Sequence, residues 1–582
     1  MSEFSSCKTP DMNEPWDGPG LPPGARAGLS AFAGAAVILM VPYVLATFFD
    51  PETKVGEAVA ELRAWVPGDP VPFAKAFNLH GTGGVGEAGG GAIAAGNEGA
   101  AGAGAEAPLP DEPALVVEPI AVGIDEPDAK AAPASDAKVA ASDAKAGAHH
   151  DAVAAHDARG EHGDAAVAAA EPDTAQAPTP PAPENLYARI HIPEETWTGL
   201  TTFIEDPSNS MATFYAKLAD VALKRPGAKV RISHWGDSAL AADGMTSAAR
   251  RLLQRTFGDG GHGYAMLASA NPWYMRKDVI WTASGWQAEE FIRDNAEDRR
   301  YGFGGVASVG YQGARASWQT VSDDKATSGK SASQFIIYYQ AQKGGGALTV
   351  KVDGDDNRTI QTRSENGERS DEVVTITVPD GPHTFEVRNS GGGRTKVYGV
   401  ALERDSGVVY DGMGVVGARD ARWLNVDPDH LVRALGQRNP DLSILMYGGN
   451  ALVDDTTMDW YRDHLTQVVN LWRKALPSKS CLLMSPIDHG ERYRGRVRTV
   501  PRQLDLMKVQ REVALAVGCA WFSIYDAMGG EGTIGAWLDQ GLANGDLAHP
   551  TGKGSVALGA LWYKALMKGF AEFLASHAQG TP

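Results

Sequence analysis

The spacing of apolar residues predicts a helix, a buried strand and a second helix in one continuous stretch. Residues 211–223 repeat apolar side chains at helical spacing. Val230 and Ile232 then alternate with polar neighbours between two glycine-containing turns, which indicates a strand. Residues 239–257 are rich in Ala, Leu and Arg and lack Pro, so a helix follows. Ser238 lies at the junction, where its hydroxyl would face the open edge of a parallel sheet close to backbone N–H groups.

A different pattern occupies residues 301–406, where short runs of β-branched and aromatic residues are separated by Asp-Gly and Gly-Gly turns. Such runs are typical of an all-β sandwich. Alternating helix and strand patterns resume after residue 406, so the sandwich is predicted to be an insertion. Its clearest strands are residues 334–339, 347–352, 373–378, 384–387 and 396–402.

The first third of the chain has no pattern of a packed domain. Residues 1–26 are polar and Pro-rich, as expected for a disordered tail. Residues 27–49 carry no charge and are about as long as a membrane helix, and we expect an uncleaved anchor rather than a cleaved signal peptide. A juxtamembrane segment, 50–80, precedes residues 81–184, whose Gly, Ala and Pro content predicts a flexible linker.

Charge and cysteine content exclude some functions. The formal net charge of −19 argues against nucleic acid as a partner, because phosphate binding requires a basic surface. The three cysteines, Cys7, Cys481 and Cys519, form neither a disulfide framework nor a metal-binding spacing. Cys481 and Cys519 lie in apolar, strand-like runs, so we expect buried free thiols rather than a bridge.

Three further stretches carry residue types that would complement a reactive serine. A strand over residues 443–447 ends in a Gly-Gly turn that presents the Asn450 amide. Asp546 precedes His549 by three residues, and residues 410–418 form a glycine-rich turn with exposed backbone N–H groups. Each feature has an ordinary interpretation as well. Ser238 could be a helix N-cap, Asn450 a turn residue and His549 a capping residue.

The chemistry of ester hydrolysis accounts for the set together. His549 could take the proton of the Ser238 hydroxyl while Asp546 holds the other ring nitrogen. The oxyanion formed on attack needs two or three hydrogen-bond donors. The Ser238 N–H, the Gly417 N–H and the Asn450 amide would supply them, and we prefer Gly417 to the alternative, Gly414.

In this order, Gly236-Asp237-Ser238, a glycine, Gly449-Asn450 and Asp546-x-x-His549 resemble the SGNH (GDSL) hydrolases. The resemblance covers roughly residues 209–575. It implies an α/β fold, a three-layer sandwich around a parallel sheet, whose two parts here would be residues 185–300 and 407–578. It also implies an esterase for small acyl groups that uses Ser238, Asp546 and His549, with neither cofactor nor metal. No G-x-S-x-G motif surrounds Ser238, which argues against the α/β-hydrolase fold.

The inserted sandwich resembles the inserts of cell-wall polysaccharide O-acetylesterases, and both sugar binding and a purely structural lid stay open for it. Trp273 and its aromatic neighbours could stack on sugars or pack under a loop. Arg492 and Arg494, in a run of alternating arginines, could attract an anionic polymer or simply form a solvated loop. His489 is a second candidate base, ranked below His549 because its aspartate is adjacent rather than three residues before it.

Together these features predict a serine esterase that removes O-acetyl groups from a cell-envelope polysaccharide, with peptidoglycan as the first guess. We expect it to be anchored in the inner membrane by residues 27–49, with the catalytic domain on the extracytoplasmic side. The loop charges do not decide that orientation. Two alternatives are an acetyltransferase that uses the same triad and a non-catalytic glycan-binding protein of the envelope.

Overall fold

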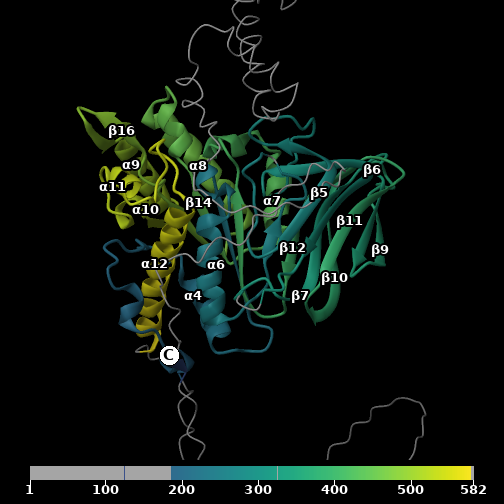
Figure 1. Ribbon diagram of the computed structural model, residues 1–582, viewed down its shortest axis with the longest axis horizontal. Coiled ribbons are helices and arrows are strands. Elements are labelled where there is room, and N and C mark those ends of the chain that lie inside the picture. Colours follow the sequence, from purple (N-terminus) through teal and green to yellow (C-terminus); the bar gives the residue numbers. More distant parts are fainter. Residues whose placement is uncertain (1–122, 125–184, 270, 324–325, 579–582) are drawn as a thin grey trace, which may run out of the picture. The chain divides into compact units, whose positions relative to one another are not determined.

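The computed structural model describes residues 123–124, 185–269, 271–323 and 326–578 (Figure 1). The predicted tail, membrane helix and juxtamembrane segment lie outside these ranges, as does the predicted linker except for β1 (Gly123–Ile124), which pairs with β2 (Ile190–His191). Among the described residues, no helix combines the length and apolarity needed to cross a membrane.

One part of the described chain is built on a five-stranded parallel sheet. Its strands, in spatial order, are β13 (Gly407–Gly414), β3 (Lys229–Gly236), β14 (Leu442–Met446), β15 (Ser480–Met484) and β18 (Ala520–Phe522). Successive residues of a strand point to opposite faces, so Ile444 packs into one apolar core and Leu445 into the other. A sheet buried on both faces needs helices on both sides.

Two groups of helices cover these faces (Figure 1). One core is shared by α4 (Ala212–Ala222), α6 (Gly244–Phe257) and α12 (Gly552–Ala578), and the other by α7 (Pro428–Arg438), α8 (Met458–Ala475) and α9 (Pro501–Ala516). Shorter helices are η1 (Leu186–Arg189), η2 (Glu194–Trp197), η3 (Asp420–Asn425), η4 (Gly449–Val453), α10 (Ile524–Ala527) and α11 (Thr533–Asp539). The arrangement is the expected three-layer α/β sandwich.

The single helix expected after Ser238 is instead two helices. α5 (Ser238–Ala241) ends within one turn, and α6 begins at Gly244. Between them Asp243 has a φ of 52°, in the left-handed region that interrupts a helix. The buried Asp243 carboxylate accepts hydrogen bonds from Arg250 and Arg276, and these bonds stabilise the break, which residue propensities alone do not reveal.

The inserted region is a nine-stranded antiparallel sheet that begins earlier than residue 301. β5 pairs with β6 along most of its length, although its small and polar residues lack a strong strand pattern. The strands are β4 (Gly263–Ala265), β5 (Ile280–Glu290), β6 (Val306–Gln319), β7 (Ala332–Ala341), β8 (Ala347–Val352), β9 (Asp355–Gln361), β10 (Ser370–Gly381), β11 (Thr384–Gly391) and β12 (Thr395–Glu403). They enclose an apolar core of their own.

A buried ionic network joins the insert to the parallel sheet. Arg438 of α7 donates two hydrogen bonds, each 2.8 Å, to Asp411 of β13 and one of 2.5 Å to Glu403 at the end of β12. All three side chains are fully buried. Burial alone would raise the pKa of Glu403, but the Arg438 charge and the hydrogen bonds from Arg231 outweigh it and lower that pKa.

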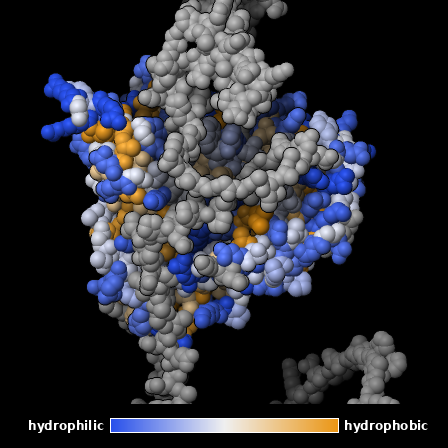
Figure 2. Space-filling model, viewed as in Figure 1, coloured by the Kyte–Doolittle hydropathy of each residue, from blue (hydrophilic) through white to orange (hydrophobic). Residues whose placement is uncertain are grey.

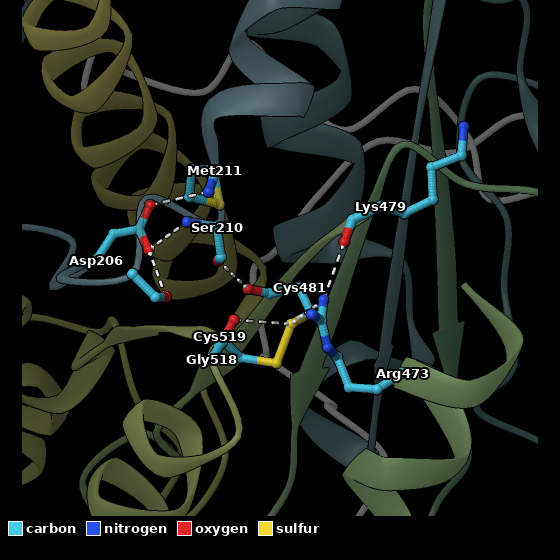
Figure 3. The surroundings of a disulfide bond; sticks show 9 residues. Asp206, Ser210, Met211, Arg473, Lys479, Cys481, Gly518 and Cys519 are labelled. Carbon is cyan, nitrogen blue, oxygen red and sulfur yellow. Dashed lines mark hydrogen bonds between the residues drawn. A yellow bond between two sulfur atoms is a disulfide. The ribbon is translucent and has the colours of Figure 1, made fainter. Parts of the chain in front are cut away.

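Cys481 and Cys519 form a disulfide, so the expectation of two free thiols was wrong (Figure 3). β15 and β18 are neighbouring strands in which Leu482 lies opposite Ala520, and this register brings the two preceding cysteines to a Cα–Cα distance of 5.0 Å. Both cysteines are buried, as expected. Their sequence spacing alone did not show that these two strands are adjacent.

We expect thiol titration of the denatured, unreduced protein to detect one thiol, that of Cys7, and titration after reduction to detect three. Replacing both Cys481 and Cys519 with Ala should lower the free energy of unfolding by about 3–4 kcal/mol, because the bridge spans 38 residues of sequence. Three thiols before reduction would contradict the pairing.

Replacing Arg438 with Met should destabilise the protein by about 3–5 kcal/mol at neutral pH, because Glu403 and Asp411 would remain buried without a counter-charge. The lowered pKa of Glu403 stabilises the wild type above about pH 4, and this contribution is lost as pH falls. In the variant an ionised, unpaired carboxylate is costly to bury. The difference in free energy of unfolding between wild type and variant should therefore become smaller as the pH is lowered.

Denaturant unfolding of the wild type and the Arg438→Met variant at several pH values measures this difference in stability. The matched control is Arg433→Met on the same helix, where the half-exposed Arg433 pairs with Asp371 and should cost less than about 1 kcal/mol. Equal effects of the two substitutions would show that burial of the network does not matter.

Candidate active site

Ser238 lies directly beyond the carboxyl end of β3, at the first position of α5. The preceding residue, Asp237, caps this helix by accepting a 3.1 Å hydrogen bond from the Ala239 N–H. The first N–H groups of a helix have no acceptor within it, so the Ser238 N–H is available to a ligand. The strand therefore delivers both the hydroxyl and a free backbone donor to the sheet edge.

The structure brings Ser238, His549 and Asp546 together across 311 residues of sequence. Ser238 Oγ is 2.7 Å from His549 Nε2, and His549 Nδ1 is 2.8 Å from Asp546 Oδ2. Asp546 Oδ1 also accepts hydrogen bonds of 3.0 Å from the N–H groups of Ala548 and His549. A carboxylate held by its own loop thus orients the imidazole with Nδ1 as donor, which leaves Nε2 to accept the serine proton.

The two partners of this pair shift each other's pKa. Burial would raise the pKa of Asp546, but the hydrogen bonds from His549 and from the backbone lower it to about 2. The hydrogen bond that His549 Nδ1 donates to Asp546 is the largest influence on the pKa of His549 and, with the charges of Asp546 and Asp237, raises that pKa above 6.5 despite partial burial. His549 is therefore a stronger base than a free histidine.

Gly417 and Asn450 lie on either side of the Ser238 loop, as expected for oxyanion donors, but they are not equivalent. Gly417 has a φ of 80° and open space where a side chain would be, and its N–H donates no backbone hydrogen bond within the described residues. Asn450 Nδ2 already donates to Asp237 Oδ2 at 3.2 Å and to the Ala418 carbonyl at 3.1 Å. An oxyanion would have to compete for the Asn450 hydrogens, whereas it would find the Gly417 N–H free.

Gly414, the alternative to Gly417, has a packing role. It is the last residue of β13, and a β-carbon there would overlap the backbone of Leu240 and Ala241 in α5. The glycine thus lets α5 approach the sheet, and its backbone is occupied by strand pairing with Gly236.

The sequence assigned no role to Asp237 beyond its place in the Gly236-Asp237-Ser238 motif. Its carboxylate is buried between the Ala239 N–H and the Asn450 amide. Burial raises its pKa, although these hydrogen bonds and the nearby His489 and His549 act in the opposite direction. The sequence signal was its place directly before the serine, but the three-dimensional neighbours that make it a buried carboxylate come from elsewhere in the chain.

The pocket beside Ser238 is small, with a cavity volume of about 10 Å³. That volume holds about one water-sized group, which suits a methyl better than a longer acyl chain. His489 contributes to its wall, but the His489 Nδ1 donates to the Ile487 carbonyl at 2.9 Å, and the serine hydroxyl contacts His549 instead. The pocket is lined by Asp237, Ser238, Ala239, Met446, Pro486, Ile487, His489, Ala548 and His549.

The predicted substrate-binding residues lie outside this pocket. Trp273 is 63% exposed, whereas Tyr274 and Trp281 pack edge to face, as a packing role predicts. Arg492 and Arg494 are exposed in the hairpin that follows His489. In the part of the chain that the structure describes, no group of three or more His, Cys, Asp or Glu side chains could hold a metal ion.

One solved structure with a similar fold is a peptidoglycan O-acetylesterase, which is 24% identical and matches with a TM-score of 0.54, covering 64% of this chain and 99% of that one. A family two carbohydrate esterase from Cellvibrio japonicus, at 13% identity, covers 51% of this chain and 99% of that one, but its TM-score of 0.22 supports no comparison. No curated protein sequence matches the chain.

A protein-family match locates the similarity within the sequence more closely than the comparison with solved structures does. Residues 379–557 match the GDSL-like lipase/acylhydrolase family. This segment includes Gly417, Asn450, Asp546 and His549, while Ser238 precedes it on the other side of the insert. Over residues 379–557 the chain is therefore similar to the GDSL-like lipase/acylhydrolase family, and this match supports a carboxylic ester hydrolase.

Proposed function

We propose that the protein is a serine esterase that removes O-acetyl groups from a cell-envelope polysaccharide. The observation that carries this proposal is the continuous contact from Ser238 Oγ through His549 to Asp546. A serine hydroxyl needs such a base to become a nucleophile at neutral pH. The small pocket beside the hydroxyl favours acetyl among the possible acyl groups.

The reaction follows from the positions of these groups. His549 Nε2 takes the Ser238 proton as Oγ attacks the acetyl carbonyl, and the N–H groups of Ser238 and Gly417 donate to the resulting oxyanion. The protonated His549 then gives its proton to the departing sugar oxygen, which leaves an acetyl ester on Ser238. Water, deprotonated by His549, attacks that ester and releases acetate, and the proton returns to Ser238 Oγ.

The proposal extends to the polymer and to the location of the enzyme. Peptidoglycan is the first polymer to test, because a protein that shares the fold acts as a peptidoglycan O-acetylesterase. Residues 27–49 would hold the enzyme at the inner membrane, with its catalytic domain on the extracytoplasmic side, where that polymer lies.

Replacing Ser238 with Ala should reduce hydrolysis of 4-nitrophenyl acetate and acetate release from O-acetylated peptidoglycan by at least about 10⁴-fold, because the nucleophile is lost. Circular dichroism and thermal unfolding should be unchanged. Ser247→Ala, which removes another buried serine hydroxyl from the same region, is the control and should retain activity. Full activity of the Ser238 variant would rule out the proposed mechanism.

Replacing Asp546 with Asn should lower kcat/KM by about 10²–10⁴-fold, because an amide opposite His549 Nδ1 favours the wrong tautomer. A base acts when neutral, so wild-type activity should rise with pH through a midpoint above 6.5. The Asn variant loses the main cause of that raised pKa, and its midpoint should move to lower pH. Full pH–rate profiles measure both effects, with exposed Asp539→Asn as the control.

A further inference from the structure

The hairpin formed by β16 (Gly490–Tyr493) and β17 (Arg496–Thr499) is attached directly to the catalytic loop. The Gly490 N–H donates a 2.7 Å hydrogen bond to the carbonyl of Leu547, which lies between Asp546 and His549. His489, the residue before the hairpin, lines the pocket of Ser238. At about 3.3 Å per strand residue, Arg492 begins roughly 10 Å and the tip roughly 20 Å from that pocket wall.

The tip of this hairpin carries three exposed arginines, Arg492, Arg494 and Arg496. None of them forms an ion pair with a described residue, whereas Arg498 nearer the base pairs with Glu491 at 2.5 Å. The chain's formal net charge of −19 comes almost entirely from residues 1–184, so residues 185–582, which include the hairpin, are close to neutral. Figure 2 shows the projecting hairpin as strongly hydrophilic at its end. The cations are therefore concentrated beside the pocket and left without a counter-charge.

The turn does not itself require an arginine. Arg494 and Gly495 both have positive φ, at 48° and 78°, and a two-residue turn of this kind favours Asn-Gly. Tyr493, which is 43% exposed, lies under the guanidinium groups of Arg494 and Arg498, 5.0 Å and 3.9 Å from its ring centre. These contacts hold the Arg494 charge near the ring. Arginine binds carboxylates through paired hydrogen bonds, which suits such a surface to an anion.

We propose that the β16–β17 hairpin binds carboxylate groups of the acetylated glycan, so that the substrate of this esterase is an anionic polysaccharide. This inference rests on the proposed function. The carboxylates could belong to the sugars, as in a polyuronate, or to peptides attached to the glycan, as in peptidoglycan. In both cases the polymer would extend from the Ser238 pocket along the hairpin, and its acetyl ester would be delivered to the nucleophile.

The test compares the wild-type protein with the triple variant Arg492→Gln, Arg494→Gln, Arg496→Gln. Acetate release is measured from O-acetylated polygalacturonate, from O-acetylated peptidoglycan and from neutral acetylated xylan. We expect kcat/KM of the variant to fall about 5- to 20-fold on at least one anionic polymer at low salt. Activity on xylan and on 4-nitrophenyl acetate should be unchanged. The ratio of the wild-type kcat/KM to that of the variant on the anionic polymer should decrease between about 20 mM and about 500 mM NaCl, because salt screens exposed charges.

The control triple variant, Lys224→Gln, Arg255→Gln, Lys343→Gln, changes the net charge equally at exposed sites away from the hairpin. It should retain wild-type kinetics on every substrate. Loss confined to polygalacturonate would identify sugar carboxylates, and loss confined to peptidoglycan would identify peptide carboxylates.

Three results would overturn the proposal. These are unchanged kinetics of the hairpin variant on both anionic polymers, an equal loss in the control variant, or lost binding to phosphatidylglycerol vesicles with intact glycan kinetics. If the wild type hydrolyses neither the polymers nor 4-nitrophenyl acetate, the proposed function itself fails. Retention of Ser238→Ala protein on polygalacturonate, with and without the three hairpin substitutions, then still decides whether the hairpin binds carboxylates.

Discussion

The site depends on the parallel pairing of β3 with β13 and β14 on its two sides. β13 matches β3 residue by residue from Lys229–Gly407 to Gly236–Gly414, although the entire inserted sheet separates the two strands in sequence. β14 matches the same end of β3, with Met446 opposite Gly236. Since the three carboxyl ends meet at one edge, the Ser238, Gly417 and Asn450 loops must lie together. The Arg438 network supports this edge indirectly, because it fixes the end of the insert to β13.

The sequence alone was sufficient to predict those features for which the chemistry of the residue types and the local sequence pattern agree. Ser238, Asp546 and His549 are residue types with a shared reaction, at positions where a strand ends or a helix begins, and the structure brings them into contact. What could not be predicted depends on contacts between distant segments. The bridge of Cys481 requires knowledge that β15 and β18 are neighbours, and β5 becomes a strand through its pairing with β6 despite weak strand propensity.

Asp237 and Asp546 are two carboxylates near the His549 imidazole whose different environments shift their pKa values in opposite directions. Asp546 has a side chain that is 42% exposed and fully hydrogen-bonded, and its pKa falls to about 2. Asp237 is buried, and its pKa is raised. Both charges favour protonated His549, Asp546 through a direct hydrogen bond and Asp237 through space. The imidazolium that forms when Ser238 attacks is thus stabilised by both carboxylates, which lowers the energy of the charged intermediate.

The exposed positive charges of the β16–β17 hairpin lie close in the fold to the active site. The formal net charge of −19 comes almost entirely from residues 1–184, and residues 185–582 carry acidic and basic side chains in nearly equal number. The three arginines at the tip of the β16–β17 hairpin form no ion pair with a described residue, and the hairpin base is hydrogen-bonded to the loop that carries His549. The positively charged hairpin and the catalytic loop are therefore neighbours at the same edge of the molecule.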